Sequence, residues 1–452
     1  MNSEIFRQYD IRGIVNQDLT RDVAHNIGRA YGTMLRSAKK HTITLARDCR
    51  LSGVALYEAF AHGVLATGIH IIDLEITPTP CLYFSLHHIV DVDGGVIITG
   101  SHNPAEYNGF KLAIGKTTIH GETIQELKKI IESKNFIIGR GTLQSYDIIT
   151  PYIDHLADDI KISNKNISFA LDGGNGTGGP VAVQLFKKLG VPPRDELFIE
   201  MDGQFPNHHP DPTVPENLQD LITSVREKKL NVGIAFDGDA DRIGAIDDKG
   251  NILWGDELMI LFARDILQAK KQGTFISEVK SSQVMYDDIE KHGGKAIMWK
   301  TGHSLIKEKM QEVGALLAGE MSGHIFFADR YFGYDDAIYA AARLVEIISK
   351  NTVPLSELLR DLPKTFKTPE IRVDCPDTKK FSIVSKITEH YKKTHAVIDI
   401  DGARIQFQDG WGLVRASNTQ PVLVLRFEAQ SETTLKKIQT DIEGTLEKFL
   451  KD

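Results

Sequence analysis

Cysteine, long apolar runs and excess positive charge are all scarce in this sequence, and each scarcity removes a class of protein. Only three cysteines occur in 452 residues, without the spacing of a metal site, so reduced thiols in a cytoplasmic protein are expected. No apolar run approaches the roughly 20 residues of a membrane-spanning helix, and the first residues lack a secretory signal pattern. The formal net charge of −8 argues against broad nucleic-acid binding. A soluble cytoplasmic protein without nucleic-acid or membrane partners is therefore predicted, and an anionic ligand would need a local basic cluster.

A serine stands on a predicted turn directly after a buried strand. Residues 95–98 (GVII) precede residues 99–104 (TGSHNP), and such a turn holds a side chain at the rim of a sheet. A hydrolase nucleophile is one interpretation, but its G-x-S-x-G turn needs glycine where Asn103 stands. His102 is expected to be a poor base for Ser101, because adjacent side chains of extended backbone point apart. A serine that carries a phosphoryl group is preferred, and this requires a metal and phosphate-binding groups elsewhere.

Three aspartates alternate along a second predicted turn. Residues 232–236 (VGIAF) precede Asp237, Asp239 and Asp241, and alternating carboxylates of a short turn converge on one side. An EF-hand opens with the same spacing, but Arg242 stands where its glycine is required, and a strand leads into the turn instead of a helix. A solvated acidic hairpin is the alternative, although clustered acids are costly unless a cation neutralises them. The pattern predicts a Mg²⁺ site.

Two further segments accompany these turns and complete a recognisable set. They are residues 319–324 (GEMSGH) and residues 415–421 (RASNTQP). Together with residues 101–104 and 237–242, they resemble the sugar, phosphate, phosphoserine and metal loops of the α-D-phosphohexomutase superfamily, in the family's order. The similarity extends from residues 9–13 (YDIRG) to the C-terminal helix, and it is greatest to the bacterial phosphomannomutase/phosphoglucomutase branch.

The resemblance implies a role for each matching residue. Ser101 would carry the phosphoryl group and, with the three aspartates, bind Mg²⁺. Lys111 and His303 are the candidates for proton transfer at the sugar oxygen. The other implied contacts are to phosphoserine or substrate by Tyr9, Arg12, Arg242 and Lys280, to sugar hydroxyls by Glu320, Ser322 and His324, and to phosphate by Arg415, Ser417, Asn418 and Thr419. An isolated histidine after glycine is often only a turn residue, so His324 is the weakest of the sugar contacts.

The implied reaction is the reversible interconversion of hexose 1-phosphate and hexose 6-phosphate, of mannose, glucose or both. A hexose 1,6-bisphosphate would form as the intermediate and turn over in the cleft, and the enzyme is expected to be a monomer. Phosphoglucosamine mutase is an alternative, although that branch usually has Gln where Met321 stands and Ala where Gly100 stands. A sugar-phosphate-binding protein without catalysis is a second alternative, and the intact serine and aspartates argue against it.

A strand–helix–strand unit recurs three times, and a different pattern follows. The three copies begin at residues 42–46, 167–171 and 274–277, and each has the order of a βαβ half-unit. After Pro363, short alternating strands lie between two helices. The predicted fold is three similar α/β domains with mixed sheets plus a smaller α+β C-terminal domain around one central cleft. The expected domains are 1–146 (phosphoserine loop), 147–250 (metal loop), 251–365 (sugar loop) and 366–452 (phosphate loop), with a proline-containing hinge at 362–369.

Two sequence patterns are typical of a dinucleotide site and of a zinc site, but neither site is expected here. Residues 174–179 (GNGTGG) match the dinucleotide-binding pattern, with acidic residues roughly twenty positions further on. Pro180 disturbs the expected unit, so a plain glycine turn is preferred, and a nicotinamide-dependent oxidoreductase is the alternative. The histidine pairs 87–88 and 208–209 are interpreted as loop residues and not as zinc ligands, because paired neighbours cannot easily share one ion.

Overall fold

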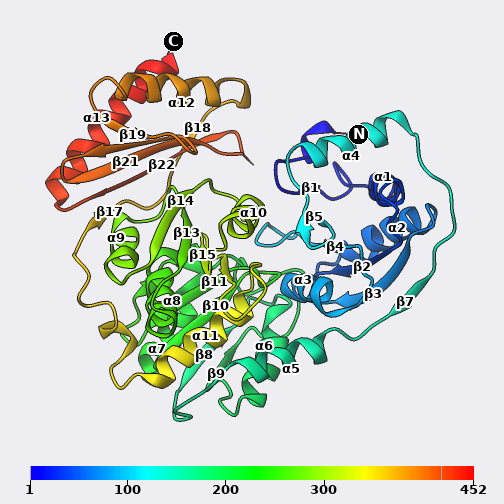
Figure 1. The fold of residues 1–452 in the computed structure, drawn as a ribbon, viewed down its shortest axis with the longest axis horizontal. Coiled ribbons are helices and arrows are strands. Elements are labelled where there is room, and N and C mark those ends of the chain that lie inside the picture. The colour runs from blue at the N-terminus through cyan, green and yellow to red at the C-terminus, as the bar shows by residue number, and fades with distance from the viewer. Residues whose placement is uncertain (1, 419, 452) are drawn as a thin grey trace.

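Four β-sheets with attached helices make up the computed structural model, which describes residues 2–418 and 420–451 (Figure 1). The N-terminal sheet lies at the right of Figure 1, and the C-terminal sheet lies at the upper left beneath α12 and α13. The third sheet lies below the C-terminal sheet, and the second sheet lies below the third. Within the described residues, none of the helices combines the length and apolarity needed to cross a bilayer.

The first sheet is mixed and has the order β1-β5-β4-β2-β3-β7, with β6 paired to β5. Strands β4, β2 and β3 are parallel, whereas β1 and β5 are antiparallel to their neighbours. Its strands are β1 (Ile11–Ile14), β2 (Thr42–Arg47), β3 (His70–Ile76), β4 (Gly94–Ile98), β5 (Tyr107–Ile114), β6 (Thr117–Thr118) and β7 (Leu143–Ser145). Its helices are η1 (Ser3–Ile5), α1 (Arg21–Ser37), α2 (Gly53–Leu65), α3 (Thr79–His88) and α4 (Glu122–Ser133).

The second sheet, β12-β11-β10-β8-β9, combines a parallel half with an antiparallel half. Its strands are β8 (Phe169–Asp172), β9 (Asp195–Leu197), β10 (Val232–Phe236), β11 (Ile243–Asp247) and β12 (Ile252–Leu253). Its helices are α5 (Ile149–Asp159), α6 (Gly178–Lys188), η2 (Pro215–Leu218) and α7 (Gln219–Lys228).

The third sheet, β14-β13-β15-β16, repeats this mixed arrangement. Its strands are β13 (Thr274–Glu278), β14 (Lys295–Trp299), β15 (Leu317–Gly319) and β16 (Ile325–Phe327). Its helices are α8 (Gly255–Lys270), α9 (Gln283–Lys291), α10 (His303–Val313), α11 (Ala337–Lys350) and η3 (Leu355–Glu357).

The fourth sheet is antiparallel throughout and has the order β17-β22-β21-β20-β19, with β18 beside β22. Its strands are β17 (Phe366–Lys367), β18 (Ile371–Asp374), β19 (Ala396–Ile398), β20 (Ala403–Phe407), β21 (Gly410–Ala416) and β22 (Val422–Ala429). Its helices are α12 (Asp377–Tyr391) and α13 (Glu432–Lys451), which pack against each other and against the sheet.

One hydrophobic core joins the first three units, and α11 is central to it. Side chains from α3, α6, α8 and α11 belong to this cluster, while separate clusters fill the N-terminal and C-terminal sheets. Helix α11 is buried on all sides from Ala337 to Ser349, as expected for a helix that packs between layers instead of facing water. The first three units therefore share one continuous interior, and the fourth unit has an interior of its own.

The architecture confirms the predicted fold of three α/β units with mixed sheets and an α+β C-terminal unit. Helix α6 begins at Gly178, so the last two glycines of the glycine run and Pro180 lie in its first turn. The interpretation of His87 and His88 as loop residues is wrong, because both lie in the last turn of α3. The three cysteines are unpaired.

Candidate active site

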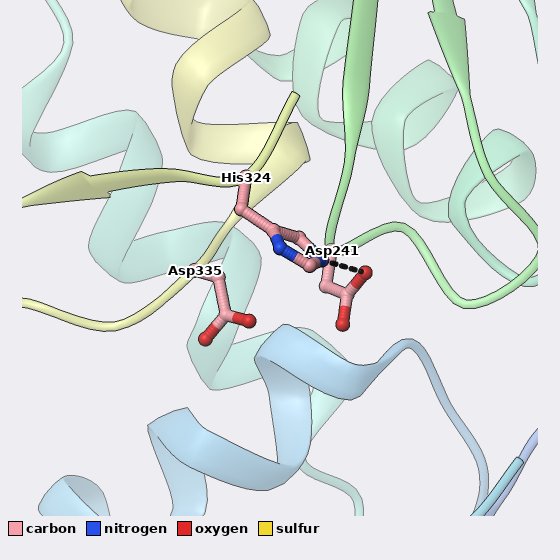
Figure 2. Close-up of side chains that lie close together, drawn as sticks. All are labelled: Asp241, His324 and Asp335. Carbon is pink, nitrogen blue, oxygen red and sulfur yellow. Dashed lines mark hydrogen bonds and ion pairs between the residues drawn. The ribbon is translucent and has the colours of Figure 1, made fainter. Parts of the chain in front are cut away.

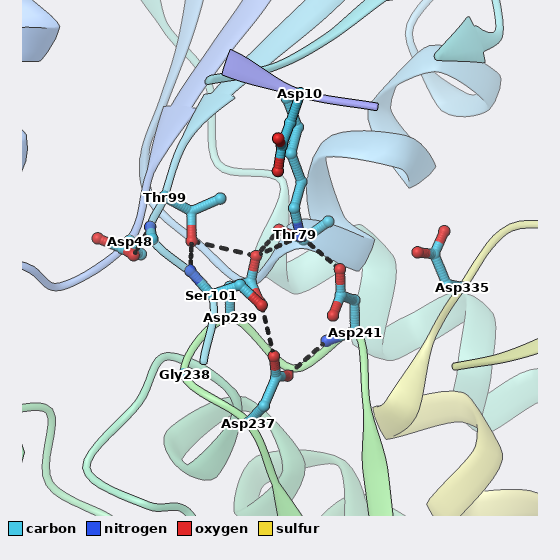
Figure 3. A network of polar contacts seen from close by, with 12 residues as sticks. Asp10, Asp48, Thr79, Thr99, Ser101, Asp237, Gly238, Asp239, Asp241 and Asp335 are labelled. Atoms are coloured by element: carbon cyan, nitrogen blue, oxygen red, sulfur yellow. Dashed lines mark hydrogen bonds and ion pairs between the residues drawn. The ribbon is translucent and has the colours of Figure 1, made fainter. Parts of the chain in front are cut away.

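Ser101 lies on a tight turn between β4 and β5, almost completely buried. Its φ of +49° is in the left-handed region, which is uncommon for a residue with a side chain and occurs where the surroundings hold the backbone. The Ser101 backbone N–H donates to Thr99 Oγ1 at 2.8 Å. The Ser101 hydroxyl donates to Asp237 Oδ2 at 2.7 Å. The turn therefore presents the serine oxygen to the predicted metal loop of the second unit (Figure 3).

The side chain of His102 does not point away from Ser101, although extended backbone would separate the two side chains. Its Nδ1 lies 3.1 Å from Ser101 Oγ, because the left-handed turn at Ser101 removes the extended backbone that would separate adjacent side chains. Burial, followed by the charges of Arg242 and Arg12, holds the pKa of His102 well below its usual value. An uncharged imidazole therefore faces the serine hydroxyl.

Asp237, Asp239 and Asp241 form a buried carboxylate cluster after β10. One carboxylate oxygen from each lies within 4.8 Å of the others. Asp239 Oδ2 accepts hydrogen bonds from Thr79 Oγ1 at 2.6 Å and from Thr99 Oγ1 at 3.1 Å, whereas Asp239 Oδ1 is buried and has no hydrogen-bond partner among the described residues. The convergence predicted from the alternating spacing is thus observed.

Lys111, from β5, reaches into this cluster from the first unit. Its ammonium donates to Asp239 Oδ2 at 2.7 Å and forms a second, shorter hydrogen bond with Asp241 Oδ2. Burial alone would lower the pKa of Lys111, but the carboxylates of Asp239 and Asp241 outweigh it and raise the pKa above its usual value. The lysine is therefore held as a cation against the carboxylates.

The donor set of this cluster fits a hard divalent cation. Carboxylate and hydroxyl oxygens are the ligands that Mg²⁺ and Ca²⁺ prefer. Burial, and then the neighbouring carboxylates of Asp239 and Asp241, raise the pKa of Asp237 well above its usual value. A bound cation would relieve the repulsion among the three carboxylates. The buried, unpartnered oxygen of Asp239 is a free ligand atom in this set.

His324 connects the predicted sugar loop to the predicted metal loop. Its Nδ1 lies 2.7 Å from Glu320 Oε2, and its Nε2 lies 3.1 Å from Asp241 Oδ1 (Figure 2). Burial alone would lower the pKa of His324, but the charge of Asp241 and the hydrogen bonds with Asp241 and Glu320 together outweigh burial, and the pKa is about 9. Arg242 Nε also lies 3.1 Å from His324 Nε2. His324 is therefore a linking residue and more than a turn residue.

His303 begins α10 and lies beside a buried carboxylate that the sequence analysis missed. Its Nδ1 is 3.3 Å from Asp335 Oδ2, and Lys307 Nζ is 2.9 Å from Asp335 Oδ1. Burial, and then the Lys307 charge, lower the pKa of His303. Asp335 follows an aromatic loop whose pattern gives no strand-end signal, so no sequence feature marks it as part of the site.

The Arg415 turn, at the end of β21, lies where the fourth unit contacts the first and third units. Arg415 pairs with Asp401 at 3.0 Å, and burial of the pair leaves little of the guanidinium exposed. Asn418 Nδ2 donates to the Tyr9 hydroxyl at 2.9 Å, and that hydroxyl donates to the Thr301 carbonyl at 2.8 Å. Tyr9 thus joins the first, third and fourth units. Thr419 lies outside the described residues.

The remaining predicted site residues are distributed around these groups. Arg12 pairs with Asp10 at 2.7 Å and donates to Asn103 Oδ1 at 3.1 Å, next to the serine turn. Lys280 lies 3.4 Å from Glu278 and 3.1 Å from Glu370, on the side of the fourth unit. Ser417 Oγ accepts from the Gln420 backbone N–H, and Ser322 is partly exposed on the turn between β15 and β16.

The glycine-rich turn after β8 packs against the aspartate loop. A Cβ on Gly176 would lie 2.6 Å from the Gly238 carbonyl, and the Thr177 N–H donates to that carbonyl at 3.1 Å. A Cβ on Gly238 would in turn lie 2.5 Å from the Ser101 carbonyl. Asp195, the acidic residue expected near a ribose, instead pairs with Lys228 at 2.5 Å. The glycines serve close packing of the two loops, which supports the preferred interpretation of a plain glycine turn.

A buried serine hydroxyl beside a carboxylate cluster is an arrangement that suits phosphoryl transfer. Family models described as phosphoglucomutase/phosphomannomutase alpha/beta/alpha domains I, II and III match residues 3–137, 150–250 and 254–366. The model of the C-terminal domain of that family matches residues 370–445. The chain belongs to the phosphoglucomutase/phosphomannomutase family, as the four segments predicted.

Individual relatives are similar along almost the whole chain. A phosphoglucomutase of Neisseria gonorrhoeae is 45% identical over 450 residues, which cover 98% of this chain and 97% of the relative. A phosphomannomutase/phosphoglucomutase of Pseudomonas putida is 45% identical over 439 residues, which cover 96% and 94%. The crystal structure of a phosphoglucomutase/phosphomannomutase family protein from Burkholderia thailandensis has a TM-score of 0.94 at 41% identity and covers 99% of this chain and 98% of that one.

Proposed function

We propose that this enzyme interconverts the 1-phosphate and the 6-phosphate of glucose and of mannose through a phosphoserine at Ser101. The single observation that carries the proposal is the 2.7 Å contact between Ser101 Oγ and Asp237 Oδ2, inside a buried carboxylate cluster. The similarity to relatives named for glucose, and for mannose and glucose together, supports both sugars as substrates.

Ser101 and its neighbours perform the transfer in this proposal. The bond between the Ser101 oxygen and phosphorus breaks while a sugar hydroxyl forms a new bond to phosphorus, and a base takes the hydroxyl proton. In the second half, the Ser101 oxygen forms a bond to the other phosphorus of the hexose 1,6-bisphosphate. The bond from that phosphorus to the sugar oxygen breaks, and this oxygen takes up the proton that the base holds. Arg12, which donates to Asn103 Oδ1 beside the turn, and Arg242, which follows the third aspartate, neutralise charge on the transferring oxygens. Such neutralisation is the main catalytic requirement of phosphoryl transfer.

Mg²⁺ is the proposed cofactor, with Asp237, Asp239, Asp241 and the phosphorylated Ser101 as its ligands. When bound, it supplies positive charge that stabilises the transferring phosphoryl group.

His303 and Lys111 have different roles at the sugar oxygen: His303 accepts a proton, and Lys111 donates a hydrogen bond. Burial lowers the pKa of His303, so its imidazole is uncharged near neutral pH and can accept a proton from the sugar hydroxyl. Lys111 is held as a cation by Asp239 and Asp241, which suits it to donate a hydrogen bond to an oxygen that gains negative charge. Asp335, whose Oδ2 lies 3.3 Å from His303 Nδ1, would help to orient the imidazole.

The sugar and the non-reacting phosphate are bound on the opposite wall of the cleft. Glu320 and Ser322 bind sugar hydroxyls, and Lys280 and Tyr9 contact the substrate beside them. The phosphate loop consists of Arg415, Ser417, Asn418 and Thr419. It would bind the phosphate at C1 or at C6, so that one site serves both orientations of the bisphosphate.

In this proposal each of the four units supplies one loop of the active site. Units with boundaries at 1–146, 147–250, 251–365 and 366–452 would supply the phosphoserine, metal, sugar and phosphate loops. Because every assigned residue comes from one chain, a monomer is sufficient for the reaction. The three unpaired cysteines support a cytoplasmic location.

Coupled assays with glucose 1-phosphate, mannose 1-phosphate and glucosamine 1-phosphate, combined with intact-mass measurement, test the proposal. Wild-type enzyme treated with glucose 1,6-bisphosphate should gain one phosphoryl group and act on the first two sugars. Ser101→Ala should lack the added mass and lose activity while it stays folded. Ser349→Ala is the matched control, because Ser349 is equally buried and its hydroxyl donates to Glu346 O, outside the site. A fully active Ser101→Ala enzyme would overturn the mechanism.

A further inference from the structure

Arg50 lies behind the serine turn and is fully buried. It follows β2, from which no functional side chain was predicted. Its guanidinium donates to four backbone carbonyls and one carboxylate. These partners are Ser101 O at 2.7 Å, Asn103 O at 2.5 Å, Pro104 O at 2.6 Å, Tyr107 O at 3.1 Å and Asp48 Oδ2 at 3.1 Å.

These contacts use the complete hydrogen-bonding capacity of the side chain. An arginine has five N–H donors in a fixed planar fork, and here five donor bonds are formed. Lysine has three donors on a flexible stem and cannot reproduce this pattern. Because the peptide bonds are trans, the Ser101 carbonyl that turns toward Arg50 turns the His102 N–H away from it. The guanidinium thus determines how the backbone of the serine turn faces the cleft.

The guanidinium itself has no room to move. Asp48 Oδ2 accepts from both Arg50 Nε and the Gly100 N–H, each at 3.1 Å. A Cβ on Gly100 would lie 2.5 Å from Arg50 Cζ. The ring of Phe205, from the second unit, covers the guanidinium at 5.0 Å. The serine turn is therefore fixed by a charged group that both the first and second units enclose.

We propose that Arg50 is a positioning residue for phosphoryl transfer, which keeps Ser101 Oγ directed at the carboxylate cluster throughout the reaction cycle. The inference rests on the proposed phosphoserine mechanism. In that cycle Ser101 alternates between a neutral hydroxyl and a phosphoryl group with nearly two negative charges. A turn whose carbonyls lacked partners would rearrange between these states. Arg50 touches neither substrate nor phosphate and acts through the backbone of the turn.

The test compares Arg50→Lys with Arg343→Lys. Arg343 is also buried and pairs with Asp329, and neither residue belongs to the site. Both variants should lose thermal stability. Only Arg50→Lys should lower kcat, by about 100-fold, as expected when a reacting atom is misplaced by about 1 Å. Its KM for glucose 1-phosphate should stay unchanged, because Arg50 contacts no substrate. A kcat equal to that of Arg343→Lys, or a loss expressed in KM, would overturn the inference.

Gly100→Ala is the second variant and displaces the guanidinium without removing it. It should lower kcat by less than Arg50→Lys does and leave KM unchanged. A wild-type kcat in Gly100→Ala would count against the inference even if Arg50→Lys fails to fold.

Intact-mass measurement after treatment with glucose 1,6-bisphosphate distinguishes failure of the phosphoserine mechanism from failure of the role proposed for Arg50. A wild-type enzyme that gains no phosphoryl group would overturn the proposed mechanism and this inference together. Labelled wild type with unaffected variants would overturn the role of Arg50 alone.

Discussion

The serine turn of the first unit and the Arg415 turn of the fourth unit are held in different ways. The serine turn is packed on both sides, with the five donor bonds of Arg50 behind it and Gly238 in close contact with the Ser101 carbonyl. The Arg415 turn is held from behind by Lys380, which donates to the Gln420 carbonyl at 3.1 Å, and it meets the first unit through Asn418 and Tyr9. The reacting oxygen is thus fixed within a shared core, whereas the phosphate loop belongs to a unit with its own core.

Because the two turns are held differently, substitutions near them should change different kinetic constants. A reacting atom must be placed to a fraction of an ångström for transfer to occur, so changes on the serine side should appear in kcat. A phosphate loop must release and rebind an intermediate that turns over, so changes on its side should appear in KM. Three substitutions test this contrast, from the largest expected effect to the smallest.

Asp239→Asn should produce the largest effect and should change the metal dependence of the rate. An amide is a poorer ligand for a hard cation than a carboxylate. Half-maximal activity should therefore require about 10- to 100-fold more Mg²⁺, which is the loss of metal affinity found when a residue that hydrogen-bonds to a metal ligand is replaced. Titration of Mg²⁺ at saturating substrate measures this. Asp195→Asn is the control, because Asp195 pairs with Lys228 away from the cluster. An unchanged titration in Asp239→Asn would exclude Asp239 as a ligand.

Arg415→Lys should raise KM by about tenfold with little change in kcat. Lysine keeps the charge but loses the paired fork, and one charge-assisted hydrogen bond contributes about 1.5–3 kcal/mol. KM should rise by a similar factor for glucose 1-phosphate and for glucose 6-phosphate, since both present the non-reacting phosphate to the same loop. Arg264→Lys is the control, because Arg264 pairs with Asp288 and Asp361 instead. A rise for only one of the two substrates would contradict the shared phosphate site.

Tyr9→Phe should give the smallest effect, a rise in KM of about fivefold, which corresponds to the roughly 1 kcal/mol of one net hydrogen bond. The substitution removes the hydroxyl between Asn418 and Thr301 and leaves the ring in place. Steady-state kinetics in both directions measures it. Tyr391→Phe is the matched control within the C-terminal unit, where the hydroxyl donates to Asp441 at 2.9 Å. If Tyr9→Phe lowered kcat instead, the phosphate loop would be coupled to the chemistry more directly than the contacts indicate.

The sequence alone determined the fold class, the family and the loops, because strand ends, turns and alternating acids are local patterns. The strand before Asp237 ends at Phe236, as residues 232–236 predicted, and the alternating aspartates converge.

Only the tertiary structure decided which side chains stand behind those loops. Arg50 lies 51 positions from Ser101, Asp335 lies 28 positions from Lys307, and His324 lies 83 positions from Asp241. No local sequence pattern encodes contacts over such separations. The orientation of His102 toward Ser101 was predicted wrongly for the same reason, since the left-handed φ of Ser101 depends on packing from Arg50 and Gly238. Periodicity and turn chemistry place a residue at the edge of a sheet, whereas the charge and shape of distant segments fix the direction in which it points.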